Sequence, residues 1–78
     1  MTDARIVPDP NHPNDPTEVR VSPSMVPVWA LIGYWRAVDC RPSKVCADYG
    51  ITAEEMKAAL RYYAGHRAEI DVRLMQNG

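Results

Sequence analysis

Cysteine and histidine are the side chains of this sequence best suited to nucleophilic or metal chemistry. Cys40 and Cys46 are the only cysteines, and His12 and His66 are the only histidines. The cysteine spacing is wider than the gap of about two to four residues found in zinc knuckles, and both histidines are remote in sequence. Cysteines six positions apart on one helix point in different directions and seldom form a disulfide. We therefore expect two small, partly buried thiols, and neither a metal site nor a cofactor.

Catalysis would need a nucleophile beside a base. Neither His12 nor His66 has a serine, cysteine or acidic partner placed next to it in the sequence. The chain has 78 residues, enough for one small domain. A domain of this size buries only about 60% of its unfolded surface. These features predict a binding protein rather than an enzyme.

Charge and hydropathy exclude two further classes. Nine basic and ten acidic side chains give a net charge of −1, which is not typical of a strongly basic nucleic-acid binder. The longest apolar stretch, residues 26–34, is about half the length of a membrane helix. The N-terminus has acids and prolines where a signal peptide would have a basic start and an apolar run. We expect a cytoplasmic protein with no membrane partner.

The prolines divide the chain into two parts. Residues 1–16 contain four prolines and only Ile6 and Val7 as sizeable apolar groups, which predicts a flexible, acidic tail. Alternatively, this tail docks on a partner through Ile6 and Val7. Residues 17–78 are expected to form the domain, beginning with short β-like runs at 18–21 and 25–28. Because a lone two-stranded ribbon is unstable, we expect these runs to pair with a second copy or a partner.

A helix is predicted from Pro27 onward, and it is apolar nearly all round. Such a helix is either buried in a large core or shared between subunits. We expect it to form a homodimer interface through Trp29, Ile32 and Trp35, with Gly33 allowing close approach of a second backbone. The alternative is a core helix with two exposed aromatic residues.

Residues 42–60 have the pattern of a helix-turn-helix. A short helix from Pro42 to Tyr49 is followed by a turn at Gly50, and Thr52 with Glu55 forms a capping box that opens the next helix. A further helical pattern covers residues 66–75. The predicted fold is all-α, a helix-turn-helix-like domain of three to four helices with a short N-terminal β element. The candidate DNA contacts are Lys44, Lys57 and Arg61, although the weak net charge between residues 36 and 61 gives little counter-ion release.

Three segments together carry a family resemblance. They are VPVWALIGYWRA, the short helix ending in DYG, and ITAEEMKAALRYYAGHRAEIDVRL. Over residues 18–75 the chain resembles the small bacterial family known as domain of unknown function 433. Its members look like antitoxins encoded beside PIN-type ribonuclease toxins, in the manner of VapBC systems. The glycine and arginine with which that family enters its first helix are absent here.

The resemblance implies an antitoxin-like protein that binds and neutralises a cognate PIN-type ribonuclease. Binding of its own operator DNA through the helix-turn-helix is compatible with that role. The candidate toxin-binding residues lie on the last helix: Arg67, Ile70, Arg73 and Leu74. Ile70 and Leu74 would be apolar anchors, and the arginines would face an acidic, metal-binding toxin site. The alternatives are a stand-alone DNA-binding transcriptional regulator and a protein-interaction adaptor that does not bind DNA.

Overall fold

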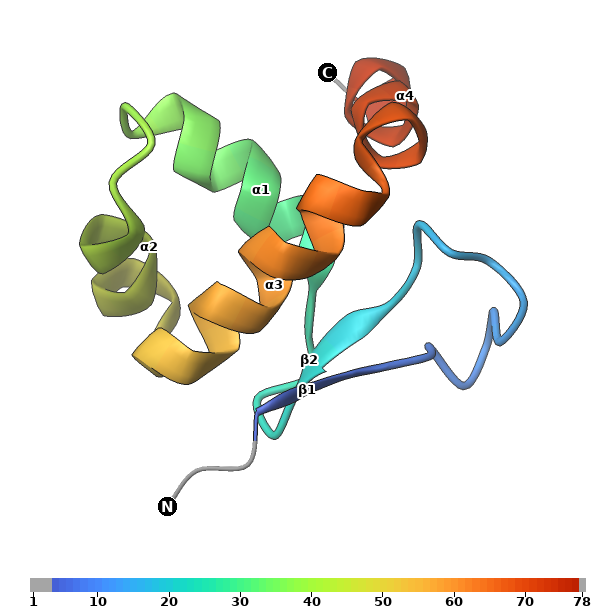
Figure 1. The fold of residues 1–78 in the computed structure, drawn as a ribbon, viewed down its shortest axis with the longest axis horizontal. Coiled ribbons are helices and arrows are strands. Elements are labelled where there is room, and N and C mark those ends of the chain that lie inside the picture. Colours follow the sequence, from blue (N-terminus) through green and yellow to red (C-terminus); the bar gives the residue numbers. More distant parts are fainter. Residues whose placement is uncertain (1–3, 78) are drawn as a thin grey trace.

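Four helices pack beside a three-stranded antiparallel sheet in the computed structural model, which describes residues 4–77 (Figure 1). The strands are β1 (Arg5–Val7), β2 (Arg20–Ser22) and β3 (Val26–Pro27). The helices are α1 (Val28–Ala37), α2 (Pro42–Tyr49), α3 (Ala53–Gly65) and α4 (Arg67–Asn77). The predicted all-α class is therefore wrong, because the sheet is an integral layer and the fold is mixed α/β. The predicted helices are present.

Strand β1 comes from the segment that the sequence predicts to be a flexible tail. It pairs antiparallel with the central strand β2, with Ile6 opposite Val21, and β3 pairs with the other edge of β2. Val21 is completely buried, and Ile6 packs against the core. The prediction of a flexible tail is thus corrected for residues 4–16. The sheet is also completed within one chain, so β2 and β3 need no strand from a partner.

Polar contacts hold the long connection between β1 and β2. Asp9 accepts a hydrogen bond from the backbone N–H of Asn11, and Asp15 accepts one from that of Thr17. Farther along the chain, the Tyr62 hydroxyl donates to the carbonyl of Pro16 at 2.6 Å. These turns allow a proline-rich segment to follow a fixed course over α3 and α4.

Helix α1 supplies three residues of the core. Val28, Leu31 and Ile32 are completely buried, together with residues from every other helix. At Gly33, an added Cβ would lie 3.0 Å from Cδ2 of Leu74, so the glycine lets α4 of the same chain approach closely. Close approach at this glycine was predicted for a second copy, and the structure assigns it to α4. The remaining core residues are Val21, Val45, Ile51, Met56, Ala59, Tyr63 and Ile70.

The turn between α2 and α3 has the glycine conformation and the capping hydrogen bonds that the sequence predicts. Gly50 adopts the left-handed conformation with φ of 68°, and its N–H donates to the carbonyl of Cys46. The hydroxyl of Thr52 accepts from the N–H of Glu55, whose carboxylate accepts from the N–H of Thr52, so the capping box is confirmed. Val45 of α2 is buried, whereas Tyr49 at the end of this helix is exposed.

Glu55 also connects the helical part to the sheet. Its side chain is 2% exposed, and its second carboxylate oxygen accepts a hydrogen bond from the N–H of Ser24 at 2.8 Å. Burial alone would raise the pKa of Glu55, but the hydrogen bonds from Ser24 and Thr52 outweigh it and lower the pKa. The carboxylate therefore ties the β2–β3 turn to the first turn of α3.

Within residues 4–77, none of the four helices is both long and apolar enough to cross a membrane.

Candidate binding groove along α3

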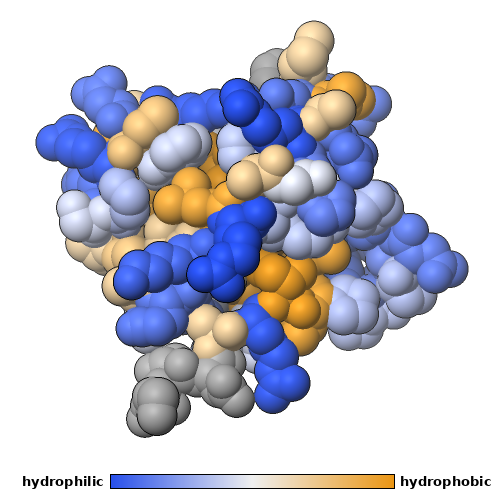
Figure 2. All heavy atoms as spheres, viewed as in Figure 1, coloured by the Kyte–Doolittle hydropathy of each residue, from blue (hydrophilic) through white to orange (hydrophobic). Residues whose placement is uncertain are grey.

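Helix α3 lies at the centre of the fold, with α1 and α2 on one side and β1 and β2 on the other. Its outward stripe is exposed and includes Glu54, Lys57 and Arg61. Figure 2 shows hydrophobic residues in hollows on either side of hydrophilic side chains over this part of the molecule. The surface beside α3 therefore has the character of a binding site.

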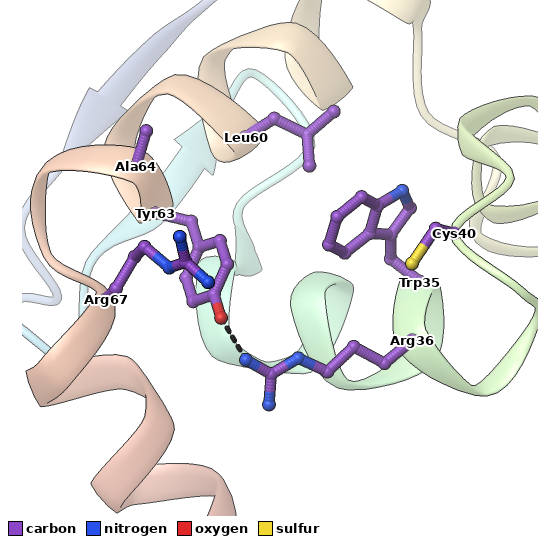
Figure 3. Close-up of a pocket in the computed structure, with 7 residues that line it drawn as sticks. All are labelled: Trp35, Arg36, Cys40, Leu60, Tyr63, Ala64 and Arg67. Atoms are coloured by element: carbon purple, nitrogen blue, oxygen red, sulfur yellow. Dashed lines mark hydrogen bonds between the residues drawn. The ribbon is translucent and has the colours of Figure 1, made fainter.

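Two adjoining hollows on the α1–α2 side of α3 share Leu60 and form what we call the α3 groove. The larger has a volume of about 500 Å³ and the smaller about 250 Å³. The larger is lined by Trp35, Arg36, Cys40, Leu60, Tyr63, Ala64 and Arg67 (Figure 3). The smaller is lined by Pro42, Ser43, Cys46, Ala53, Met56, Lys57 and Leu60.

The groove combines an apolar and aromatic lining with positive charge. Trp35 and Tyr63 meet edge to face, with ring centroids 6.4 Å apart. The charged side chains that line the two hollows are Arg36, Lys57 and Arg67, and all are cationic. Such a lining suits apolar groups flanked by negative charge.

Arg36 is already engaged inside the protein. Its guanidinium donates to the Tyr63 hydroxyl and forms an ion pair with Asp71 (Figure 3 shows the bond to Tyr63). The hydrogen bond from Tyr63, and the charge and hydrogen bond of Arg36, lower the pKa of Asp71 against the opposing effect of desolvation. Lys57 and Arg67 form no ion pair within the described part of the chain, so they are the free charges of the groove.

Neither cysteine in the groove is set up as a nucleophile. The Cys46 thiol donates to the carbonyl of Thr52 at 3.6 Å, and burial together with the nearby charge of Glu55 raises its pKa. A raised pKa keeps the thiol protonated and unreactive at neutral pH. Cys40 is exposed at the edge of the larger hollow.

The loop that carries Cys40 has an unusual backbone. Asp39 and Cys40 are consecutive non-glycine residues with φ of 59° and 58°. Left-handed conformations of this kind cost free energy and gather at binding and catalytic sites, where the surrounding structure maintains them. Here they turn the chain from α1 into α2 beside the larger hollow.

The candidate DNA contacts are only partly brought together. Lys57 and Arg61 are exposed one turn apart on α3, but Glu54 precedes them on the same stripe. Lys44 lies on α2 and pairs with Asp48 at 3.1 Å. Hydrogen bonding to Asp48 raises the pKa of Lys44, so the lysine is charged but locally neutralised.

The candidate dimer residues differ in exposure. Ile32 is completely buried within the single chain, so its assignment to a dimer interface is wrong. Trp29 and Trp35 are partly buried, and their indole Nε1 atoms are buried without a hydrogen-bond partner among the described residues. Trp29 is covered by the guanidinium of Arg73 at 4.9 Å from the ring centroid. Trp35 is the candidate that faces a hollow.

The candidate toxin-binding residues are also divided by the structure. Ile70 is completely buried and Leu74 packs against Gly33, so neither is an external anchor. Arg73 pairs with Glu18 and donates to Thr17. Arg67 remains exposed, with its guanidinium 5.7 Å from the centroid of the Tyr63 ring. The apolar side chains that α4 does expose are Val72 and Met75, which sequence reasoning missed.

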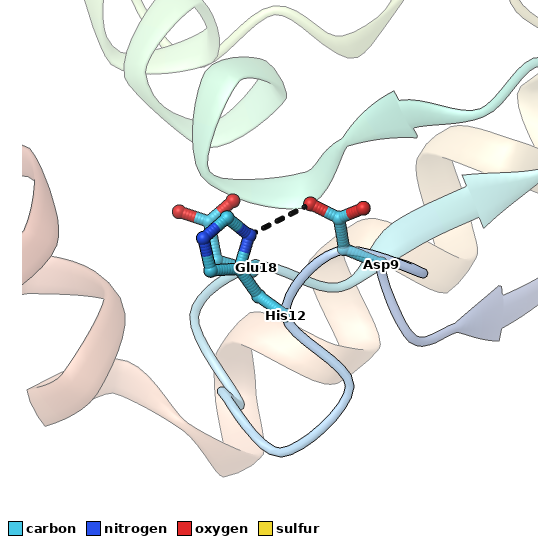
Figure 4. Close-up of side chains that lie close together, drawn as sticks. All are labelled: Asp9, His12 and Glu18. Atoms are coloured by element: carbon cyan, nitrogen blue, oxygen red, sulfur yellow. Dashed lines mark hydrogen bonds and ion pairs between the residues drawn. The ribbon is translucent and has the colours of Figure 1, made fainter.

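The structure also gathers Asp9, His12 and Glu18, which the sequence did not associate (Figure 4). One potential ligand atom from each lies within 4.8 Å of the others. Arg20 lies 3.6 Å from the Asp9 carboxylate, and Arg73 pairs with Glu18. A hydrogen bond from the N–H of Asn11, followed by His12 and Arg20, lowers the pKa of Asp9 against desolvation. With both carboxylates neutralised by arginine, the cluster acts as an internal ion-pair network.

No protein-family model, curated protein or solved structure matches this chain. The resemblance over residues 18–75 therefore depends on the sequence motifs alone, and the binding properties of the α3 groove follow from its own geometry and charge.

Proposed function

We propose that the protein is an antitoxin-like binding module that neutralises a cognate PIN-type ribonuclease by occupying its surface. The observation that supports this most is the α3 groove, an apolar hollow whose charged lining residues are all cationic. Inhibition by occupation needs no chemistry from this chain. It needs apolar burial at a groove and charge that matches the partner.

The groove changes which residues carry the proposed contact. Trp35 and Leu60, which line the larger hollow above the buried Tyr63 ring, replace Ile70 and Leu74 as the apolar contact surface, because the latter two face the core and Gly33. Arg67 remains as a cation for an acidic, metal-binding ribonuclease site. Aromatic and arginine side chains in partly enclosed pockets are the ones that dominate binding energy in protein interfaces.

Co-expression with the product of the neighbouring gene, which the proposal expects to be a PIN-type ribonuclease, tests this proposal. We expect the two proteins to elute together and the ribonuclease to lose activity in the complex. Separate elution at micromolar concentration, with full ribonuclease activity, would overturn the proposal. Arg67→Glu should weaken the complex and Arg61→Glu should leave it intact, since Arg61 lies outside the groove.

Operator binding is a second candidate function, favoured by the helix-turn-helix corner and by the exposure of Lys57 and Arg61 on α3. DNA affinity should fall steeply with salt because phosphate contacts release counter-ions. Arg61→Glu should weaken DNA binding and spare ribonuclease inhibition, while Arg67→Glu should do the reverse. A stand-alone regulator would lose DNA binding in Arg61→Glu and would show no ribonuclease inhibition. An adaptor would show neither DNA binding nor inhibition.

Self-association is a separate proposal, with Trp35 as the surviving candidate contact. Because Trp35 also lines the α3 groove, a homodimer formed there and a complex with the ribonuclease exclude each other. Light scattering of the wild-type chain and of Trp35→Glu at low micromolar concentration tests it. We expect the wild type to have at least twice the mass of the variant. A wild-type mass equal to that of one chain would overturn the dimer.

A further inference from the structure

The two hollows of the α3 groove are lined by residues at equivalent positions, offset by seven along the chain. The smaller hollow uses Ala53, Met56, Lys57 and Leu60, and the larger uses Leu60, Tyr63, Ala64 and Arg67. Each member of the second set stands seven positions after its counterpart in the first. Seven residues are two helical turns, or about 10.5 Å of axis. Along α3 the two hollows therefore lie on either side of Leu60, with equivalent lining positions about 10.5 Å apart. Arg67, the last of these residues, is the first residue of α4.

We propose that the α3 groove binds an amphipathic α-helix of a partner protein, with two large apolar side chains seven positions apart and acidic residues near both ends. The apolar side chains occupy the two hollows, and the acidic residues face Lys57 and Arg67. This inference rests on the proposed function, in which the ribonuclease supplies the helix.

The spacing of the hollows selects a helix over an extended strand. In a helix, positions i and i+7 lie on the same face about 10.5 Å apart, which matches the repeat. In a strand, side chains on one face recur every second residue, about 6.6 or 13 Å apart. A strand residue at about 10 Å would point to the opposite face. Two hollows at this separation are therefore filled together by a helix.

The positive charge of the groove determines the sign of the charge expected on the partner helix. Lys57 lines the smaller hollow and Arg67 the larger, so each hollow has one cation that forms no ion pair among the described residues. Arg36, the third cation, already pairs with Asp71. A partner helix with a carboxylate near each end satisfies both free cations, whereas a basic helix places like charges together.

A second copy of this chain does not supply the required pattern. Among the described residues, the large apolar side chains that are exposed are Met25, Tyr49, Val72 and Met75. No two of these stand seven positions apart, and the two on α4 are three apart. The occupant is therefore a helix from a different protein.

Synthetic helical peptides of about 18 residues test the inference without the ribonuclease, at a length that supports helicity in water. One peptide carries leucines at i and i+7 with a glutamate near each end. A composition-matched control carries the leucines at i and i+5, and a second control has lysine in place of glutamate. Fluorescence anisotropy with the full chain should show the first peptide binding at least about tenfold more tightly than either control. Equal affinities for the first two peptides would overturn the helical register.

Charge reversals in the groove complete the test. Lys57→Glu and Arg67→Glu should each weaken the glutamate peptide at least about fivefold and improve the lysine control. Arg61→Glu, a matched change on the helix that carries Lys57 but outside the groove, should alter neither affinity. Circular dichroism establishes that all three variants are folded. Unchanged affinity in the two groove variants would overturn the assignment of acidic partner residues to Lys57 and Arg67.

The same variants separate this inference from the proposed function. If the ribonuclease binds the wild type and both groove variants equally, the function stands and the groove assignment is wrong. If the peptides behave as expected but the ribonuclease never binds, the groove assignment stands and the antitoxin function is wrong.

Discussion

The helical part of the molecule, residues 28–77, and the N-terminal segment, residues 4–22, are held in place by different forces. Nine of the ten buried hydrophobic residues lie in the helical part, and Val21 is the single one from the N-terminal segment. The N-terminal segment is fixed instead by contacts between polar groups, among them Glu18 with Arg73 and Pro16 with Tyr62. Burial dominates the stability of the first part, and directional polar contacts decide the position of the second.

The two parts should respond differently to salt and pH. Apolar burial depends little on salt and pH, whereas ion pairs near the surface weaken with ionic strength. The two parts should therefore separate experimentally, and five substitutions test how far this holds.

Removal of core volume should have the largest effect. Leu31→Ala creates a cavity in α1 and should lower the free energy of unfolding by about 2–5 kcal/mol, because Leu31 is completely buried. Ile6→Ala in β1, where the side chain is only partly buried, should cost less than about 2 kcal/mol. Urea denaturation monitored by tryptophan fluorescence measures both. Equal losses would contradict the division into two differently stabilised parts.

Glu55→Gln acts where the two parts meet, and should cost about 1–3 kcal/mol at neutral pH. Glutamine keeps the shape but loses one of the acceptors that serve Ser24 and Thr52. Because the folded pKa of Glu55 is lowered, the stabilisation is present above its ordinary pKa and disappears as pH falls through the folded pKa. Unfolding curves of wild type and variant should converge well below about pH 4. A constant difference at every pH would contradict this.

Glu18→Gln should act on the N-terminal segment and cost about 1 kcal/mol, since Arg73 keeps its contact with Trp29. Hydrogen exchange should accelerate at the β1 and β2 amides and change little in α2. High salt should reduce the difference between wild type and variant. Equal acceleration in α2 would mean that the segment and the helices unfold as one unit.

Tyr62→Phe should have the smallest effect, about 0.5–1 kcal/mol. Phenylalanine keeps the ring, which is stacked on His66 with centroids 3.9 Å apart, and removes the hydroxyl that donates to Pro16. Faster exchange near residues 16–20 with an unchanged helical core is the expected result. No change in exchange would show that the hydroxyl contributes nothing to the position of the segment.

The same division explains which parts of the fold could be predicted. The helices follow from apolar spacing and local signals, because the proline that begins α2, Gly50 and the Thr52–Glu55 box all act on neighbouring residues. Strand β1 was not predictable in this way. Its pairing with β2 depends on Ile6 meeting Val21 and on contacts of Thr17 and Glu18 with Arg73, more than fifty positions away.

The sequence did not reveal which side of each helix faces the core, and this limited the prediction of the candidate site. The sequence named Trp35, Lys57 and Arg67 as candidate dimer, DNA and toxin contacts respectively, and the structure places all three in the lining of the α3 groove. It placed Ile70 outside because the polar neighbours of Ile70 suggested an amphipathic surface helix, whereas α4 turns this face to the core. The seven-position recurrence of groove residues around Leu60 becomes meaningful only when the residues from α1 and α2 that line the other side of the groove are known.

The contact between Glu18 and Arg73 also has a consequence for biosynthesis. A ribosome makes residues 4–18 before Tyr62 and Arg73, at about 5–20 residues per second. Residues 16 and 18 therefore lack their partners until α3 and the first part of α4 have been made. The N-terminal segment reaches its native position only after these later helices are present.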